Sequence, residues 1–177
     1  IILVAIPSHS FRDVVKKIAP FISAQAVVSL TKGIEAKTFS FMSDIIRTEL
    51  PEVPYGVLSG PNLAKEIMAG MPSGTVIASE SELVRYAVQH ALHSALFRVF
   101  GSDDVHGLEL GGSLSNIYAV AMGMGAAYNI GENTKSMILT RALSEMSRFA
   151  VKQGANPLTF FGLSGVGDLF ATCNSPL

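Results

Sequence analysis

The sequence has a single cysteine, Cys173, among its 177 residues. One cysteine excludes an internal disulfide bond and a metal site built on several cysteines, and it is typical of a protein of the reducing cytoplasm. An excess of one charge is also missing, because the formal net charge is -1 and the basic residues are scattered along the chain. We therefore expect neither a nucleic acid nor an anionic membrane as partner.

Long apolar runs and metal-ligand patterns are missing as well. The longest apolar stretch, residues 117–128, is shorter than the roughly 20 residues of a membrane-spanning helix, and no basic segment or cleavage site marks a signal peptide. His90 and His93 form only a weak pair, which we expect on a solvated helix face, so no metal is predicted. The chain starts inside an apolar run without methionine, which leads us to expect a fragment of a longer protein.

The chain is apolar, and strand-like segments alternate with helix-like segments along its first part. It is 49% hydrophobic and 15% charged, with a mean hydropathy of +0.40, which indicates a well-buried core. Strands are expected at residues 1–6, 26–30, 55–58, 74–78 and 97–100, and helices are expected to begin at Ser10, Lys37, Asn62 and Ser81. In the last of these helices Leu83, Ala87, Ala91 and Leu92 recur at helical spacing. Strand–helix alternation predicts the α/β class, with a doubly wound, mostly parallel sheet.

From residue 104 onward the pattern predicts helices only. We expect a long Gly- and Ala-rich helix over residues 104–128, a second over 133–153 and a short one near 157–161, followed by a loop at 165–168. The second helix has an apolar stripe made of Met137, Ala142, Met146, Phe149 and Ala150. The chain is thus expected to divide into residues 1–103 and residues 104–177.

Two segments follow expected strands at their carboxyl ends, where open α/β sheets bind ligands. Pro7 and Ser8 follow the first strand, although a plain strand-to-helix turn capped by Ser8 or Ser10 is the simpler local explanation. Lys32, within Thr31-Lys32-Gly33, follows the second strand. Its ammonium group can hold an anionic ligand, or it is a solvated lysine beside a turn glycine.

The segment Ser59-Gly60-Pro61-Asn62 follows the third strand. Gly60 permits an unusual backbone turn, and Pro61 suits the first turn of a helix. The N–H groups that follow can bind a phosphate or a carboxamide. The same pattern also occurs in ordinary loops that lead into helices.

Paired glycines mark the first of the long helices. Gly111 and Gly112 each cost about 1 kcal/mol relative to alanine inside a helix, which indicates the close approach of a neighbouring helix or of a ligand. Asp168 follows the glycine-rich segment 165–167 and is either a helix cap or a charged site residue.

Each of these segments alone is weak evidence of function, but their order and spacing along the chain are specific to one protein family. The series comprises Val4-Ala5-Ile6-Pro7-Ser8, Thr31-Lys32-Gly33, Ser59-Gly60-Pro61 with Ala64 and Glu66, Leu110-Gly111-Gly112 with Asn116, Asn133-Thr134-Lys135, Thr140-Arg141-Ala142-Leu143-Ser144-Glu145-Met146, and Gly162-Leu163-Ser164-Gly165-Val166-Gly167-Asp168-Leu169 with Thr172-Cys173. Along nearly the whole chain it resembles the bacterial type of NAD(P)-dependent glycerol-3-phosphate dehydrogenase.

This resemblance implies a Rossmann-like, partial dinucleotide-binding domain at residues 1–103 and a partial all-helical substrate domain at 104–177. It implies the reduction of dihydroxyacetone phosphate to sn-glycerol 3-phosphate for phospholipid synthesis, with NAD or NADP as cofactor and a possible homodimer. The roles that it implies are contact with nicotinamide and substrate for Lys32, substrate contact for Gly60, Asn62 and Asp168, and cofactor contact for Ala64, Pro7 and Ser8.

Three departures accompany the resemblance. The family's Gly-x-Gly-x-x-Gly loop is expected before Ile1, and its Ser-Arg-Asn segment after Leu177. The family's acid/base lysine, which also contacts substrate, falls on Ser115, because the family reads Gly-Gly-Ala-Leu-Lys-Asn where this chain reads Gly-Gly-Ser-Leu-Ser-Asn. A serine is a poor acid, so we expect impaired catalysis.

Three alternatives stay open at this point. One is another β-hydroxyacid-type dehydrogenase, such as a 3-hydroxyacyl-CoA or ketopantoate-reducing enzyme. The second is a catalytically dead relative that serves as a binding or scaffold protein. The third is that Ser115 is an engineered change that traps a substrate complex.

Overall fold

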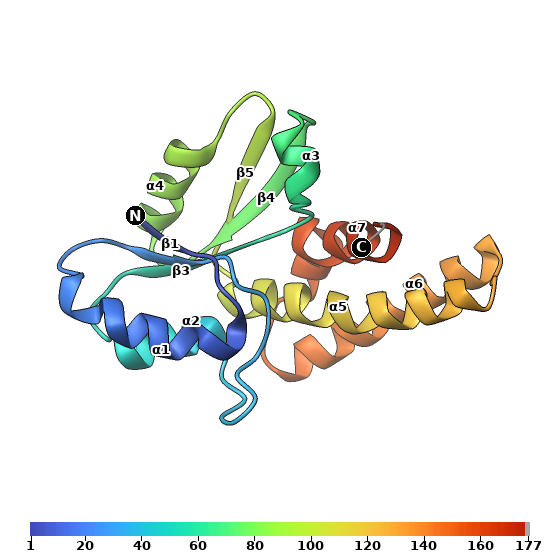
Figure 1. Ribbon diagram of the computed structural model, residues 1–177, viewed down its shortest axis with the longest axis horizontal. Coiled ribbons are helices and arrows are strands. Elements are labelled where there is room, and N and C mark those ends of the chain that lie inside the picture. Colours follow the sequence, from blue (N-terminus) through green and yellow to red (C-terminus); the bar gives the residue numbers. More distant parts are fainter. Residues whose placement is uncertain (176–177) are drawn as a thin grey trace.

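The protein, seen in a computed structural model that describes residues 1–175, is built on a five-stranded sheet (Figure 1). The strands, in sheet order, are β1 (Ile2–Val4), β2 (Val27–Ser29), β3 (Tyr55–Ser59), β4 (Ser73–Ala78) and β5 (Phe97–Ser102). All neighbours pair in parallel except β3 and β4, which are antiparallel. The prediction of a mostly parallel sheet is confirmed, although β1 and β2 are shorter than expected.

Helices lie between the strands and follow the sheet. Those of the first part are α1 (Ser8–Ile18), the short 3-10 helix η1 (Ala19–Phe21), α2 (Met42–Glu49), α3 (Ala64–Met68) and α4 (Glu82–Leu92). After β5 come α5 (Val105–Ala127), α6 (Glu132–Lys152), the 3-10 helix η2 (Pro157–Phe161), the π-helix η3 (Leu163–Gly167) and α7 (Asp168–Asn174). Within residues 1–175, none of these helices has the length and apolarity that a membrane crossing requires.

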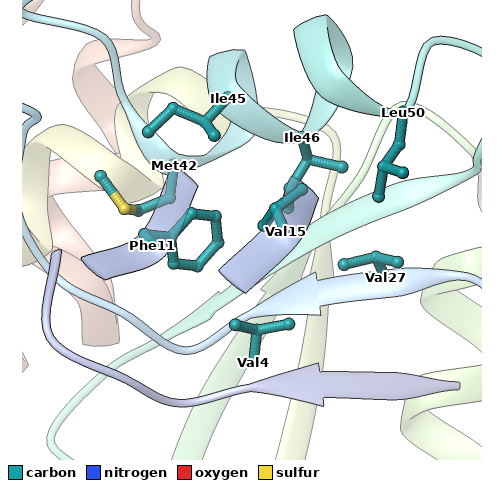
Figure 2. Close-up of a cluster of buried hydrophobic side chains, with 8 residues drawn as sticks. All are labelled: Val4, Phe11, Val15, Val27, Met42, Ile45, Ile46 and Leu50. Atoms are coloured by element: carbon teal, nitrogen blue, oxygen red, sulfur yellow. The ribbon is translucent and has the colours of Figure 1, made fainter. Parts of the chain in front are cut away.

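Helices cover both faces of the sheet because successive strand residues point to opposite sides. Figure 2 shows the first face, where α1 and α2 pack on β1 and β2 through Val4, Phe11, Val15, Val27, Met42, Ile45, Ile46 and Leu50. On the second face α4 packs on Val28, Leu58 and Ile77 through Val84 and Val88. The doubly wound arrangement is therefore confirmed.

The helices after residue 104 form a second layer of packing beside the sheet. Figure 1 shows α5 and α6 as an antiparallel pair that extends away from the strands, with α7 against α5. Asp104 caps α5, since its carboxylate accepts a hydrogen bond from the Gly107 N–H at 2.9 Å. The same side chain accepts from Thr159 Oγ1 at 2.6 Å, which fixes η2 against the start of α5.

Two of the expected apolar stripes are wrong in part. In α4, Leu83 is 81% exposed, and the buried positions are the neighbouring Val84 and Val88. In α6, Met137 and Phe149 are exposed, whereas Ala142, Met146 and Ala150 are buried. Helical spacing identifies a face but not how much of that face a neighbouring element covers.

The loop expected at residues 165–168 is also wrong, because these residues lie in η3 and at the start of α7. A Cβ on Gly165 would lie 2.1 Å from the Phe160 carbonyl oxygen. The glycine is required here because the backbone of η2 approaches closely, so the local glycine content marks tight packing between helical segments.

Candidate functional site

The carboxyl ends of β1, β2 and β3 lie at one edge of the sheet because these strands are parallel. The segments that follow β1 and β2 are joined by a hydrogen bond from Thr31 Oγ1 to the Ile6 carbonyl oxygen at 2.7 Å. Gly33 has a φ of +133°, and a Cβ there would lie 3.0 Å from Ser8 Oγ. The structure therefore brings Pro7 and Ser8 beside the Lys32–Gly33 turn.

A hydrogen-bonded cluster joins this edge to the helices. Lys32 Nζ donates to Asp168 Oδ1 at 2.5 Å, and Ser115 Oγ donates to Asp168 Oδ2 at 2.8 Å. Lys32 follows β2, Ser115 lies in α5, and Asp168 is the first residue of α7. Lys32 and Ser115, which lie in different segments of the sequence, thus both contact Asp168.

The three side chains of this cluster differ in their exposure to solvent. Ser115 is 0% exposed and Asp168 is 1% exposed, whereas the Lys32 side chain is 31% exposed. In this conformation a ligand reaches the cluster through Lys32.

The Asp168 carboxylate also acts on Cys173 in the same helix. Burial and the negative charge of Asp168 raise the pKa of the Cys173 thiol.

The charges of Lys32 and Asp168 cancel, and Ser115 adds no charge of its own. The Ser115 hydroxyl lies 3.1 Å from the Gly112 carbonyl oxygen as well as 2.8 Å from Asp168. Its single proton is therefore held by protein acceptors and is not free for a ligand.

The paired glycines of α5 are explained by close packing within the protein. A Cβ on Gly111 would lie 2.4 Å from the Ser164 carbonyl oxygen, and one on Gly112 would lie 2.7 Å from Ser59 Oγ. Gly111 lets η3 approach α5, and Gly112 lets the end of β3 do the same. These contacts hold the site together, since they fix the sheet, α5 and the start of α7 in mutual register.

We expect Gly111→Ala to lower the free energy of unfolding by about 1–3 kcal/mol, because its methyl group would collide with backbone that cannot swing aside. Gly123→Ala is the matched control in the same helix, as a Cβ at Gly123 meets nothing within 4 Å. That variant should gain about 0.5–1 kcal/mol from helix propensity. Urea unfolding of both variants measures the difference, and equal effects would contradict the packing account.

The turn after β3 adds polar atoms without partners. Gly60 has a φ of +153°, and the Asn62 amide donates from Nδ2 to Thr75 Oγ1 at 2.9 Å. Among the described residues, the buried atoms Asn62 Oδ1 and Ser59 Oγ have no hydrogen-bond partner. Buried polar atoms normally have partners, so these two can accept a bond from a ligand or water.

Ala64 opens α3, is exposed, and lies outside the Lys32 cluster. With five residues, α3 provides only a weak dipole for an anion. Among residues 1–175, no group of three or more His, Cys, Asp or Glu side chains is placed to hold a metal ion.

Glu109 is a buried acid that the sequence interpretation missed. It lies in α5, is 6% exposed, and accepts hydrogen bonds from the Ser43 N–H at 2.9 Å and from the Ser43 hydroxyl. Burial raises the pKa of Glu109 to about 7, against the lowering effect of the Ser43 hydrogen bonds. A lone acid inside an otherwise apolar, glycine-rich helix was the signal available in the sequence.

Together these features define a Rossmann-like α/β protein, with a doubly wound sheet, a helical extension and a lysine–aspartate cluster at the carboxyl edge of the strands. Two family models match the chain. The model described as NAD-dependent glycerol-3-phosphate dehydrogenase N-terminus matches residues 1–84, and the corresponding C-terminus model matches residues 104–177. The chain belongs to the NAD-dependent glycerol-3-phosphate dehydrogenase family.

Individual relatives agree with this assignment. Glycerol-3-phosphate dehydrogenase (NAD(P)+) of Acinetobacter baumannii strain SDF is 93% identical over all 177 residues of this chain and 50% of its own length. The enzyme of the same name from Psychrobacter cryohalolentis is 71% identical, again over the whole chain and 41% of its own length. The chain thus spans half or less of these curated relatives.

A solved structure shows the same fold. The crystal structure of glycerol-3-phosphate dehydrogenase from Coxiella burnetii has a TM-score of 0.93 and 36% sequence identity to this chain. The match covers 98% of this chain and 53% of the Coxiella protein.

Proposed function

We propose that this chain serves in the reduction of dihydroxyacetone phosphate to sn-glycerol 3-phosphate by NADH or NADPH, in the cytoplasm and for phospholipid synthesis. Residues 1–103 would contribute to the dinucleotide-binding domain and residues 104–177 to the helical substrate domain, within a homodimer. The observation that carries the proposal is the contact between Lys32, Asp168 and Ser115 at the carboxyl edge of the sheet.

The residues present fit a nicotinamide cofactor and a small phosphorylated ketone. Lys32 offers a partly exposed cation for an anionic ligand. Asn62 Oδ1 offers a buried acceptor that has no hydrogen-bond partner within residues 1–175. Pro7, Ser8 and Ala64 are proposed to contact the cofactor, and Gly60 and Asn62 the substrate. The cofactor, when bound, supplies the hydride.

The protein's own contribution is charge and proton handling. Reduction of a ketone produces an alkoxide that must be neutralised, and a positioned acid/base group typically contributes about 10²–10⁴ in rate. Lys32 can stabilise negative charge on the substrate, and Asp168 holds the Lys32 ammonium group in place. Ser115 is neutral, buried and engaged with Asp168, so we propose that catalysis by this chain is slow.

The test is a hybrid in which this chain replaces the matching 177 residues of the Acinetobacter relative. Oxidation of NADH and of NADPH is followed at increasing dihydroxyacetone phosphate. We expect slow, saturable, substrate-dependent oxidation, and the ratio of the two rates gives the cofactor preference.

A second candidate function is that of a binding protein without catalysis, and Ser115 is the observation that favours it. Binding of glycerol 3-phosphate to the folded hybrid, with no turnover even after a lysine is introduced at position 115, would support this second role and contradict the first.

A further inference from the structure

A small cavity lies behind Lys32, where the ends of β2 and β3 meet α5. Its volume is about 10 Å³, and its lining includes Lys32, Ser59, Glu109 and Ser113. A space of this size accommodates about one water molecule, provided that two to four polar groups surround it.

The lining supplies those polar groups. Ser59 is 3% exposed, and its Oγ has no hydrogen-bond partner among the described residues. Glu109 has acceptor capacity beyond the two bonds from Ser43. Ser113 Oγ accepts from the Gly33 N–H at 3.2 Å and keeps its own O–H to donate. An apolar cavity of this size would stay dry, but this one has side-chain oxygens of Ser59, Glu109 and Ser113 in its lining.

We propose that this cavity is a binding site for one buried water molecule, which hydrogen-bonds Ser59 Oγ and the Glu109 carboxyl group and links them behind Lys32. The water satisfies the Ser59 hydroxyl, which would otherwise be buried without a hydrogen-bond partner. It donates a hydrogen bond to Glu109 when that group is ionised and can accept one when it is protonated. The proposal does not depend on the proposed function.

Several charged or titratable groups surround Glu109. Asp44 of α2 acts on it through its charge. The pKa of the Tyr55 phenol in β3 is raised mainly by burial, with smaller contributions from the charges of Glu80 and Glu109. Lys32 lines the same cavity. The variant that tests the water must therefore change Ser59 and leave Asp44, Tyr55 and Lys32 in place. A shift in the pKa of Glu109 in such a variant is assigned to loss of the water.

The experiment is a carbon-13 NMR titration of the Glu109 carboxyl carbon in the wild-type chain and in Ser59→Ala, with Glu109→Gln used to assign the signal. Loss of the water removes a donor to the carboxylate, so the pKa of Glu109 should rise in Ser59→Ala, by on the order of one unit. The matched control is Ser79→Ala, a buried serine whose hydroxyl already donates to the Tyr55 carbonyl oxygen at 2.6 Å. That variant should leave the Glu109 titration unchanged.

Coinciding titrations of wild type and Ser59→Ala would overturn the proposal. If Ser59→Ala fails to fold, a high-resolution crystal structure of the wild-type chain decides the matter without a variant. Electron density for a water within hydrogen-bond distance of both Ser59 Oγ and the Glu109 carboxyl group supports the site, and an empty cavity refutes it.

Discussion

Ser115→Lys should accelerate the reduction of dihydroxyacetone phosphate by the hybrid about 10²–10⁴-fold. The lysine would add a positive charge to a cluster in which Lys32 and Asp168 now cancel. It would also supply the acidic proton that the Ser115 hydroxyl, bound to Asp168, cannot release. The increase should appear in kcat more than in KM, because the developing alkoxide exists only near the transition state.

The matched control is Ser115→Met, which has comparable length and no charge. Ser115 is fully buried, so both variants must displace neighbouring atoms, and thermal unfolding shows whether each still folds. A folded Ser115→Lys hybrid that is no faster than Ser115→Met would contradict the assignment of Ser115 to the acid/base position. Equal acceleration by both variants would instead trace the defect to packing.

The overall fold could be predicted from the sequence because its signals are local. Apolar runs alternate with helix-like segments up to β5, and from residue 104 the period changes to that of helices alone. The reversal of β4 was not predictable, since periodicity carries no strand direction. The wrong stripes in α4 and α6 have a similar cause, because exposure depends on which neighbour covers a face.

The site was predicted unevenly. Glycine spacing and strand ends pointed to Lys32, Gly60 and Asp168, and the resemblance added Ser115. The contact between Lys32 and Asp168 joins residues far apart in the chain, so no local pattern could give it. Glu109 was missed because its Ser43 partner lies in a different segment.

Glu109→Gln should remove a pH dependence of stability that the wild-type chain possesses. Burial raises the pKa of Glu109 from 4.5 to about 7 in the folded protein. Below pH 4.5 Glu109 is protonated in both the folded and the unfolded chain, so the stability that its raised pKa contributes is fully present. Between pH 4.5 and 7 only the unfolded chain loses the proton, and the free energy of unfolding falls. The loss by pH 8 is roughly 3 kcal/mol. Glutamine mimics the protonated acid, so the variant should be the more stable chain at pH 8.

Urea unfolding at pH 5 and pH 8 measures this effect as the difference between wild type and Glu109→Gln. The difference should grow by about 2 kcal/mol or more between the two pH values. Glu132→Gln serves as the control, because this glutamate of α6 has a side chain that is 85% exposed, and its difference from wild type should stay constant. A constant difference for Glu109→Gln as well would mean that the Ser43 hydrogen bonds outweigh burial and that Glu109 is already ionised at pH 5. In that case the carboxylate would act as a permanent anion at the start of α2, holding α5 to the sheet domain at every physiological pH.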